Sequence, residues 1–164
     1  TMNLVPQVTD VISIPVIAAG GIADGRGMAA AFALGAEGVQ VGTRFVCAAE
    51  SNVHINYKEK IIESNDRATV VTGRSTGHPV RGLKNKLSKE FEELEKRGAS
   101  VEELEKLGTG KLRLAVVEGD TKWGSLMAGQ SAGLVRKIEP AAAIIEDIIN
   151  GAAAEIERLK RFAD

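Results

Sequence analysis

The hydrophobic pattern of the chain alternates between short, wholly apolar runs and helical stripes. The clearest apolar run, Ile14-Pro15-Val16-Ile17-Ala18-Ala19, ends at the glycine pair Gly20-Gly21. Such a run, bounded by Pro and Gly, is typical of a strand that is buried on both faces of a parallel sheet. A second run, Val39-Gln40-Val41, ends at Gly42-Thr43. The pattern therefore predicts two buried strands that each deliver small residues at the carboxyl end.

A helix is predicted between these two strands. It begins near Gly25, continues through the Ala-rich residues 28–34 and ends at Gly35, a common helix stop. Residues 2–12 carry apolar side chains at the spacing of an amphipathic helix, which Ser13 and Pro15 end. Strand, helix and strand are then expected to form one right-handed crossover unit.

The middle of the chain is more polar and is predicted to be mostly helical. We expect a strand over residues 68–72 and helices over residues 56–64, 83–97, 100–108 and 112–120. The helix after Ser100 opens with a capping box formed with Glu103. Residues 73–82 are polar and Gly-rich, and this loop is long enough to be a lid or a pocket wall.

The last part of the chain combines a segment of small residues with one long helix. Small side chains in residues 123–134 allow this segment to press closely against a neighbour. Pro140 opens the final helix. Its apolar residues are interpreted as one stripe, made of Ala141, Ile144, Ile145, Ile148, Ile149, Ala152, Ile156 and Leu159.

Composition and charge narrow the class of protein. The formal net charge of the 164 residues is −1, which gives no whole-chain reason to expect nucleic acid or a membrane surface as a partner. The single cysteine, Cys47, excludes an internal disulfide framework, fits a reducing cytosol and is expected to be a buried small residue. No apolar run approaches the roughly 20 residues of a membrane helix, and nothing at the start resembles a signal peptide. We expect a cytoplasmic protein.

Two adjacent parallel strands that both deliver Gly at the same end are typical of the phosphate-binding corner of a (β/α) barrel. A phosphate needs several converging N–H donors and a close backbone approach, which Gly permits. The alternative interpretation is tight packing of helix on strand. A complete barrel takes about 250 residues, so the predicted fold is α/β, the carboxyl-terminal part of a (β/α)8 TIM-type barrel with an added helical segment. The other possibility is a small α/β domain in its own right.

Three segments carry a resemblance to a known family. Residues 15–22, residues 35–45 and Met127-Ala128-Gly129-Gln130 resemble the FMN-dependent nitronate monooxygenase superfamily. Within that superfamily, residues 50–52, 56–61 and 77–81 are similar to the branch of enoyl-acyl carrier protein reductase II. The likeness extends from Thr1 nearly to Asp164.

The resemblance implies a flavoprotein that binds FMN noncovalently and takes hydride from NADH or NADPH. The reduced flavin then passes hydride to the β-carbon of an enoyl thioester on acyl carrier protein, in fatty acid biosynthesis. By resemblance, the FMN phosphate accepts hydrogen bonds from backbone amides after the seventh and eighth strands: Ala19, Gly20 and Gly21, and then Gln40, Gly42 and Thr43. The implied partners are that thioester, the amino-terminal half of the barrel and a second copy of the chain.

The resemblance also divides the chain and assigns secondary roles. Residues 1–50 end the flavin-binding barrel, residues 51–122 form an extra, mostly helical segment with a lid loop, and residues 123–164 return to the barrel. The family's catalytic histidine belongs to an amino-terminal half that is not in this sequence, and neither His54 nor His78 sits in the matching motif. We therefore assign no catalytic residue and no metal ligand, and we expect this chain alone to be inactive.

Four further residues are weaker candidates for contact with substrate or flavin. His78 and Arg81 share a loop with donors suited to phosphate or carboxylate. Their alternative roles are a surface histidine and a salt bridge from Arg81 to the acidic helix that follows. Met127 and Gln130 border the flavin ring or an acyl pocket by resemblance, or else belong to a contact between small residues.

Other functions stay open at this stage. The same flavin can support nitronate oxidation with oxygen, and the chain can be a non-catalytic half-barrel module that complements a separate amino-terminal half. A purine nucleotide dehydrogenase also carries a motif like residues 14–22, but residues 127–130 and 56–60 argue against it. The charged face over residues 84–97 carries both signs, so we expect it to be solvated rather than to dock an acidic carrier protein.

Overall fold

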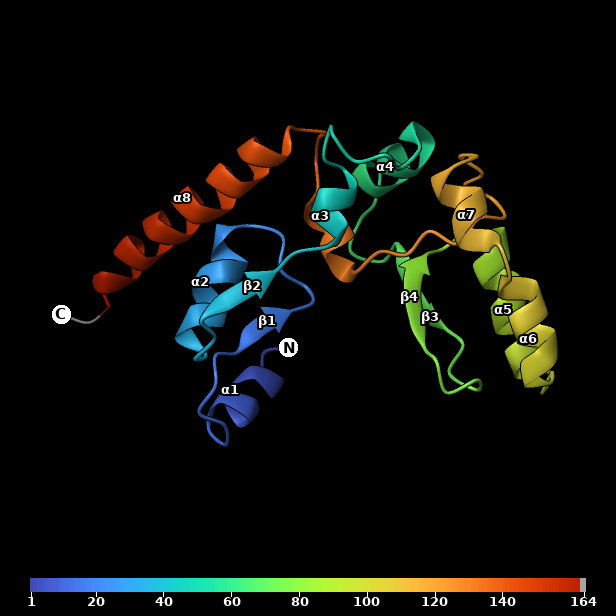
Figure 1. The fold of residues 1–164 in the computed structure, drawn as a ribbon, viewed down its shortest axis with the longest axis horizontal. Helices are drawn as coiled ribbons and strands as arrows, with labels where there is room; N and C mark the ends of the chain where they lie inside the picture. Colours follow the sequence, from blue (N-terminus) through green and yellow to red (C-terminus); the bar gives the residue numbers. More distant parts are fainter. Residues whose placement is uncertain (163–164) are drawn as a thin grey trace. The chain divides into compact units, whose positions relative to one another are not determined.

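A computed structural model describes residues 1–162, and the chain divides into two units (Figure 1). The first unit comprises residues 1–50 and the segment that begins at Glu139, and the second comprises residues 51–138. The boundary after the second unit lies later than residue 122, because residues 123–127 pair with the second unit. The N–H of Leu83 donates to the carbonyl of Leu126 at 2.8 Å, and Asn85 Nδ2 donates to the carbonyl of Gly124 at 2.8 Å.

The first unit contains the predicted strand–helix–strand order. Its elements are α1 (Leu4–Thr9), β1 (Ile17–Ala19), α2 (Gly25–Ala33), β2 (Gly38–Gln40), α3 (Thr43–Val46) and α8 (Ala141–Lys160). β1 and β2 pair in parallel, with Ile17 opposite Gly38 and Ala19 opposite Gln40 (Figure 1). β1 and α1 are shorter than the sequence pattern predicts, whereas β2 has the predicted length and begins one residue earlier.

The helices of the first unit approach each other through glycine. A Cβ on Gly25 of α2 would lie 2.2 Å from the backbone nitrogen of Ala152, so only Gly permits this crossing of α2 and α8. One buried cluster consists of Val5, Ala18, Ile22, Ala31 and Ala36, and a second of Ala48, Ile144 and Ile148.

The predicted apolar stripe of α8 is wrong in one respect, because it merges two faces of the helix. Ile144, Ile148 and Ala152 recur every four residues and are buried. Ile145, Ile149, Ile156 and Leu159 are 43–52% exposed. Successive helix positions are about 100° apart, so a neighbour of a buried residue points well away from the buried row.

The second unit is mostly helical around one hairpin. It contains α4 (Ile55–Ile62), β3 (Thr69–Thr72), β4 (Val80–Leu83), α5 (Lys86–Lys96), α6 (Val101–Gly108), α7 (Lys111–Val116) and the 3₁₀ turn η1 (Gln130–Leu134). β3 and β4 are antiparallel, with Val70 opposite Gly82 and Val71 opposite Arg81.

Two predictions for this unit are corrected by the hairpin. The last residues of the predicted loop 73–82 are strand β4, because their backbone pairs with β3. The helix predicted to begin at Leu83 begins at Lys86, because Asn85 caps it: Asn85 Oδ1 accepts from the N–H of Ser88 at 2.9 Å. The loop proper is therefore residues 73–79.

Helix ends are set by capping residues and by glycine. The predicted capping box of α6 is present, with the Ser100 and Glu103 side chains each accepting from the other's backbone N–H. α7 ends at Val116 rather than continuing to residue 120, and Gly119 after it has a φ of 69°. Cys47 is fully buried, as predicted.

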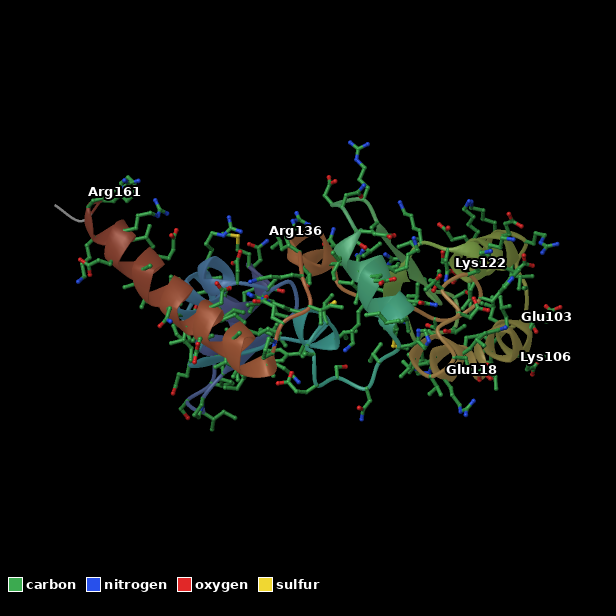
Figure 2. The ribbon with its side chains drawn as sticks, turned by 90° about the horizontal axis from the view of Figure 1, so that it is seen from above. Glu103, Lys106, Glu118, Lys122, Arg136 and Arg161 are labelled. Carbon is green, nitrogen blue, oxygen red and sulfur yellow. The ribbon has the colours of Figure 1, made fainter. Side chains whose placement is uncertain are left out.

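The surface of the second unit carries charges of both signs. Most charged residues between 84 and 97 are exposed. Around α6 and after α7, exposed side chains of both signs also point outward from the ribbon (Figure 2): Glu103, Lys106, Glu118 and Lys122. Among residues 1–162, no helix has the length and apolar character to cross a membrane.

Candidate functional site

The carboxyl ends of β1 and β2 lie side by side. The parallel register sets Ala19 opposite Gln40, so the backbone after each strand leaves the same edge of the sheet. Gly20-Gly21 follows the first of these residues directly, and Gly42-Thr43 follows the second after one residue. The predicted phosphate-binding residues of the two strands are thus neighbours.

The backbone at this edge is open to a ligand. Gly20 and Gly21 have φ values of 100° and 79°, which side-chain-bearing residues rarely adopt. Apart from the glycine itself and its two neighbours in the chain, no heavy atom lies within 4 Å of a Cβ built on Gly21 or on Gly42. Among the hydrogen bonds of residues 1–162, none uses the amide N–H of Gly21 or Gly42. These two amides are free to donate to an anion.

Thr1 orients one of these peptide groups. Its Oγ1 donates to the carbonyl of Gly20 at 2.9 Å. Since the peptide bond is planar and trans, fixing this carbonyl also fixes the opposite direction of the Gly21 N–H. The donor at Gly21 is therefore held by a partner outside the glycine loop.

The amino end of α2 is already occupied by a carboxylate. Asp24 Oδ1 accepts from the N–H of Gly27 at 3.1 Å, and its other oxygen accepts from Arg26 Nε at 2.9 Å. Burial alone would raise the pKa of Asp24, but these hydrogen bonds outweigh it and lower the pKa. A negative side chain at this position disfavours a second anion, which leaves the glycine amides as the better site.

Arg44 joins the two loops of the site to α8, and sequence reasoning missed this role. One terminal nitrogen donates to the carbonyl of Ala23 and to Asp147, each at 2.8 Å, and the other donates to Glu139 at 3.0 Å. The Arg44 and Glu139 side chains are only 11% and 10% exposed. Burial acts to lower the pKa of Arg44, but the two carboxylates raise it above its usual value. Its acidic partners lie 95 and 103 residues away, so no local pattern points to them.

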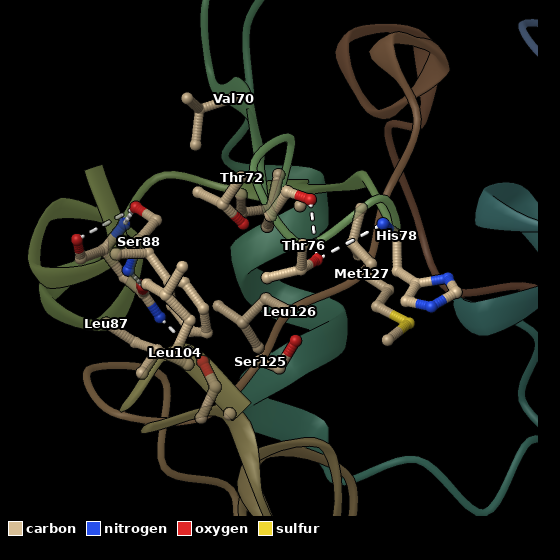
Figure 3. Close-up of a pocket in the computed structure, with 18 of the residues that line it drawn as sticks. Val70, Thr72, Thr76, His78, Leu87, Ser88, Leu104, Ser125, Leu126 and Met127 are labelled. Carbon is tan, nitrogen blue, oxygen red and sulfur yellow. Dashed lines mark hydrogen bonds between the residues drawn. The ribbon is translucent and has the colours of Figure 1, made fainter. Parts of the chain in front are cut away.

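The second unit encloses a cavity of about 220 Å³ that is lined by two of the weaker candidates, His78 and Met127 (Figure 3). The carbonyl of Met127 accepts from Tyr57 Oη at 2.7 Å, which fixes the backbone at the cavity. The structure does not bring the other two candidates into this cavity. Arg81 donates to Thr69 Oγ1 at 3.0 Å, and Gln130 begins η1.

The other histidine has a structural role. His54 Nδ1 accepts from the N–H of Asn56 at 3.1 Å and so caps α4. Its ring packs on Gly119, where an added Cβ would lie 2.2 Å from Nδ1. Within residues 1–162, no group of three His, Cys, Asp or Glu side chains is arranged to hold a metal ion.

Comparison with known proteins identifies relatives along nearly the whole chain. "Probable nitronate monooxygenase" of Staphylococcus saprophyticus is 41% identical over 152 residues, which cover 93% of this chain and 42% of that protein. The structure of FabK from Thermotoga maritima matches with 52% identity and a TM-score of 0.95. That of nitroalkane oxidase from Streptomyces ansochromogenes matches with 30% identity and a TM-score of 0.79.

These matches also place the chain within a larger fold. It covers 99% of its own length but 51% of FabK, and 96% of its own length but 45% of the nitroalkane oxidase. The chain therefore spans about half the length of the relatives it matches, and its α/β fold corresponds to part of a TIM-barrel enzyme. A family model described as "Nitronate monooxygenase" matches residues 1–151, and the chain belongs to this family of flavin-dependent oxidoreductases.

Proposed function

We propose that this chain is the carboxyl-terminal part of an FMN-dependent enoyl-acyl carrier protein reductase, which reduces enoyl thioesters with NADH or NADPH in fatty acid biosynthesis. The observation that carries the proposal is the similarity to FabK, an enoyl-acyl carrier protein reductase II, at 52% identity over 99% of the chain. The identity to the nitroalkane oxidase is 30%, and that to the probable nitronate monooxygenase is 41%.

The edge at β1 and β2 fits the phosphate of FMN. The residues that would hold it are Ala19, Gly20 and Gly21 after β1, and Gln40, Gly42 and Thr43 after β2. Support comes from the free N–H groups of Gly21 and Gly42 and the open space beside them. Converging backbone amides are the donor set that a phosphate requires. When bound, the flavin supplies the hydride chemistry, and these residues hold and orient it.

The remaining roles follow from the chain's own groups. No residue here is assigned as a catalytic acid, because neither histidine lies in the motif of the family's catalytic histidine. His78 and Met127 are proposed to lie near the substrate or flavin, and Arg81 and Gln130 are weaker candidates. The proposed partners are an enoyl thioester on acyl carrier protein, the amino-terminal half of the barrel and a second copy of the chain. The chain alone is proposed to be inactive.

The test uses the protein at the full length of its relatives, loaded with FMN. Oxidation of NADH that depends on a crotonyl thioester supports enoyl reduction. If neither NADH nor NADPH is oxidised above the rate without thioester, by a protein that retains its flavin spectrum, the proposal is overturned. Comparison of the two rates identifies the reductant.

Nitronate oxidation is the second candidate function. It is favoured by the name of the relative at 41% identity and by the match to a nitroalkane oxidase. Oxygen uptake with alkyl nitronates, together with little reduction of crotonyl thioester, would establish it in place of the reductase. If the full-length protein shows neither reaction, the chain is better described as a half-barrel binding module.

A further inference from the structure

The cavity of the second unit has the form of a binding site for an apolar chain. We propose that it receives the distal part of an unbranched acyl group, with the thioester end at the rim beside His78 and Met127. The inference rests on the proposed function for the source of that acyl group. It adds a subsite that lies wholly within residues 70–127.

The floor of the cavity is apolar and deeply buried. Four leucines from four different segments form it, and each is 1–5% exposed: Leu83 of β4, Leu87 of α5, Leu104 of α6 and Leu126. Phe91 extends this floor, with its ring against Gly108, where an added Cβ would lie 3.2 Å from the ring. A guest that buries methylene groups here is stabilised, because apolar surface is removed from water.

Asn85 and Thr76, two of the polar residues of the lining, use their hydrogen bonds within the protein. Asn85 Nδ2 donates to the carbonyls of Thr121 and Gly124, and Asn85 Oδ1 accepts from Ser88. Thr76 Oγ1 donates to the carbonyl of Gly73 at 2.8 Å. A polar guest would lose hydrogen bonds to water without gaining bonds to these two side chains, whereas an apolar guest has no such hydrogen bonds to lose.

The size of the cavity and its rim favour a slender ligand with one polar end. About 220 Å³ is below the roughly 300–1,000 Å³ of pockets that enclose drug-sized ligands, so an extended chain fits better than a dinucleotide. The exposed part of the lining includes His78, Val80 and Met127, and also Glu105 of α6. Figure 3 shows His78 and Met127 together, on the opposite side of Leu126 from Leu87 and Leu104. The imidazole of His78 gives this rim one polar group for the thioester.

The wall of the cavity is held in place before any ligand arrives. Glu95 of α5 accepts from the N–H of Ser75 at 3.1 Å and from its hydroxyl at 3.0 Å. This ties the loop of residues 73–79, which supplies Gly73, Thr76 and His78 to the lining. A preformed pocket spares the ligand the entropy of ordering the loop.

The test compares two substitutions on one strand. Val70 lines the cavity, whereas its neighbour Val71 does not and points to the other face of the hairpin. The probes are the decanoyl and acetyl thioesters of N-acetylcysteamine, titrated into the full chain by calorimetry without flavin or NADH. We expect the decanoyl probe to bind at least about tenfold more tightly than the acetyl probe. Val70→Phe should weaken decanoyl binding at least about tenfold, and Val71→Phe less than about twofold.

Equal affinity for the two probes, or unchanged decanoyl binding in a folded Val70→Phe variant, would overturn the inference. If Val70→Phe does not fold, nuclear Overhauser contacts between probe methylenes and the Leu104 methyls of the unsubstituted chain decide the matter: their presence supports the subsite, and their absence refutes it. Because this binding needs no turnover, loss of crotonyl reduction at full length would refute the proposed function separately.

Discussion

At the scale of single residues, two glycines at the same sheet edge have different reasons to be glycine. Gly21 has a φ of 79°, whereas Gly42 has a φ of −103°, and both have open space where a Cβ would project. Conformation therefore restricts the first position but not the second, although we propose that both donate amides to one phosphate.

Substitution by alanine separates these two reasons. Gly21→Ala should lower the free energy of unfolding by about 1–2 kcal/mol, because the left-handed region is unfavourable for an L-residue. Gly42→Ala should change it by less than about 0.5 kcal/mol, because its backbone and surroundings accept a methyl group. Urea unfolding of both variants measures this difference, and equal losses would contradict the assigned strain.

The buried ion pair of Arg44 gives a second prediction at this scale. Arg44→Met removes the guanidinium that donates to the buried Glu139 carboxylate, so we expect a loss of about 3–5 kcal/mol in unfolding free energy. Adding Glu139→Gln should restore part of it. Arg113→Met is the control, because its ion pair with Glu118 is exposed and should contribute less than about 1 kcal/mol. If the Arg44→Met variant is as stable as the Arg113→Met control, the hydrogen bonds of Arg44 to Glu139 and Asp147 are not needed for folding.

These residues also mark how far the sequence predicts the site. The glycines were identified because each follows an apolar run, which is a local pattern. Arg44 lies two residues beyond Gly42 but acts through Glu139 and Asp147, and only the folded chain brings those carboxylates to it. Thr1 is similar, because its contact with Gly20 depends on how α1 is placed.

At the scale of elements, α5 and the loop before β4 are joined through one carboxylate. Burial acts to raise the pKa of Glu95, but hydrogen bonds from Ser75 and the loop backbone outweigh it, so the pKa lies below its usual value of 4.5. A depressed pKa means that the folded state binds its proton less tightly than the unfolded state. The tether therefore stabilises the loop above about pH 4.5 and is lost as the pH falls through the lowered value.

Hydrogen exchange of the Ser75 amide tests this tether. Protection should be present at pH 6 and should fall below pH 4.5, and Glu95→Gln should reduce it at pH 6 already. Glu93→Gln, on the exposed side of α5, is the matched control and should leave the Ser75 amide protected. Protection that is the same in Glu95→Gln as in the unsubstituted chain would exclude the carboxylate as the cause.

Elements with strong local signals are predicted from the sequence, whereas β4, which has a weak local signal and depends on pairing, is not. The capping box at Ser100 and Glu103 is complete within four residues, so α6 was placed correctly. β4 contains Gly82, a poor strand former, and it exists because its backbone pairs with β3 and with Met127. The predicted stripe of α8 combines a buried and an exposed face for a related reason, because apolar character alone does not tell which isoleucines face α2.

At the scale of the whole molecule, the first unit exposes apolar surface that would be buried in a larger core. A parallel sheet is normally covered on both faces, yet β1 and β2 form a two-stranded sheet in which Ile17 is 57% exposed. Near them, an apolar hollow of about 250 Å³ is lined by residues of α2, β2, α3 and α8, including Ile145 and Ile149. The barrel interpretation rested on length and two strand ends, and the match to about half of FabK supports it.

Complementation tests whether these apolar surfaces belong to a barrel contact. Mixing the chain with a separately produced amino-terminal half of FabK from Thermotoga maritima should increase FMN binding, seen as a change in flavin fluorescence.

Ile145→Ser should leave the stability of the chain alone nearly unchanged, because Ile145 is 48% exposed, but should weaken this gain in FMN binding. Ala153→Ser, an exposed position elsewhere on α8, should not. If Ile145→Ser and Ala153→Ser complement equally well, the hollow is not part of the contact. If the unsubstituted chain gains no flavin on mixing, its two strands do not complete a barrel in this way.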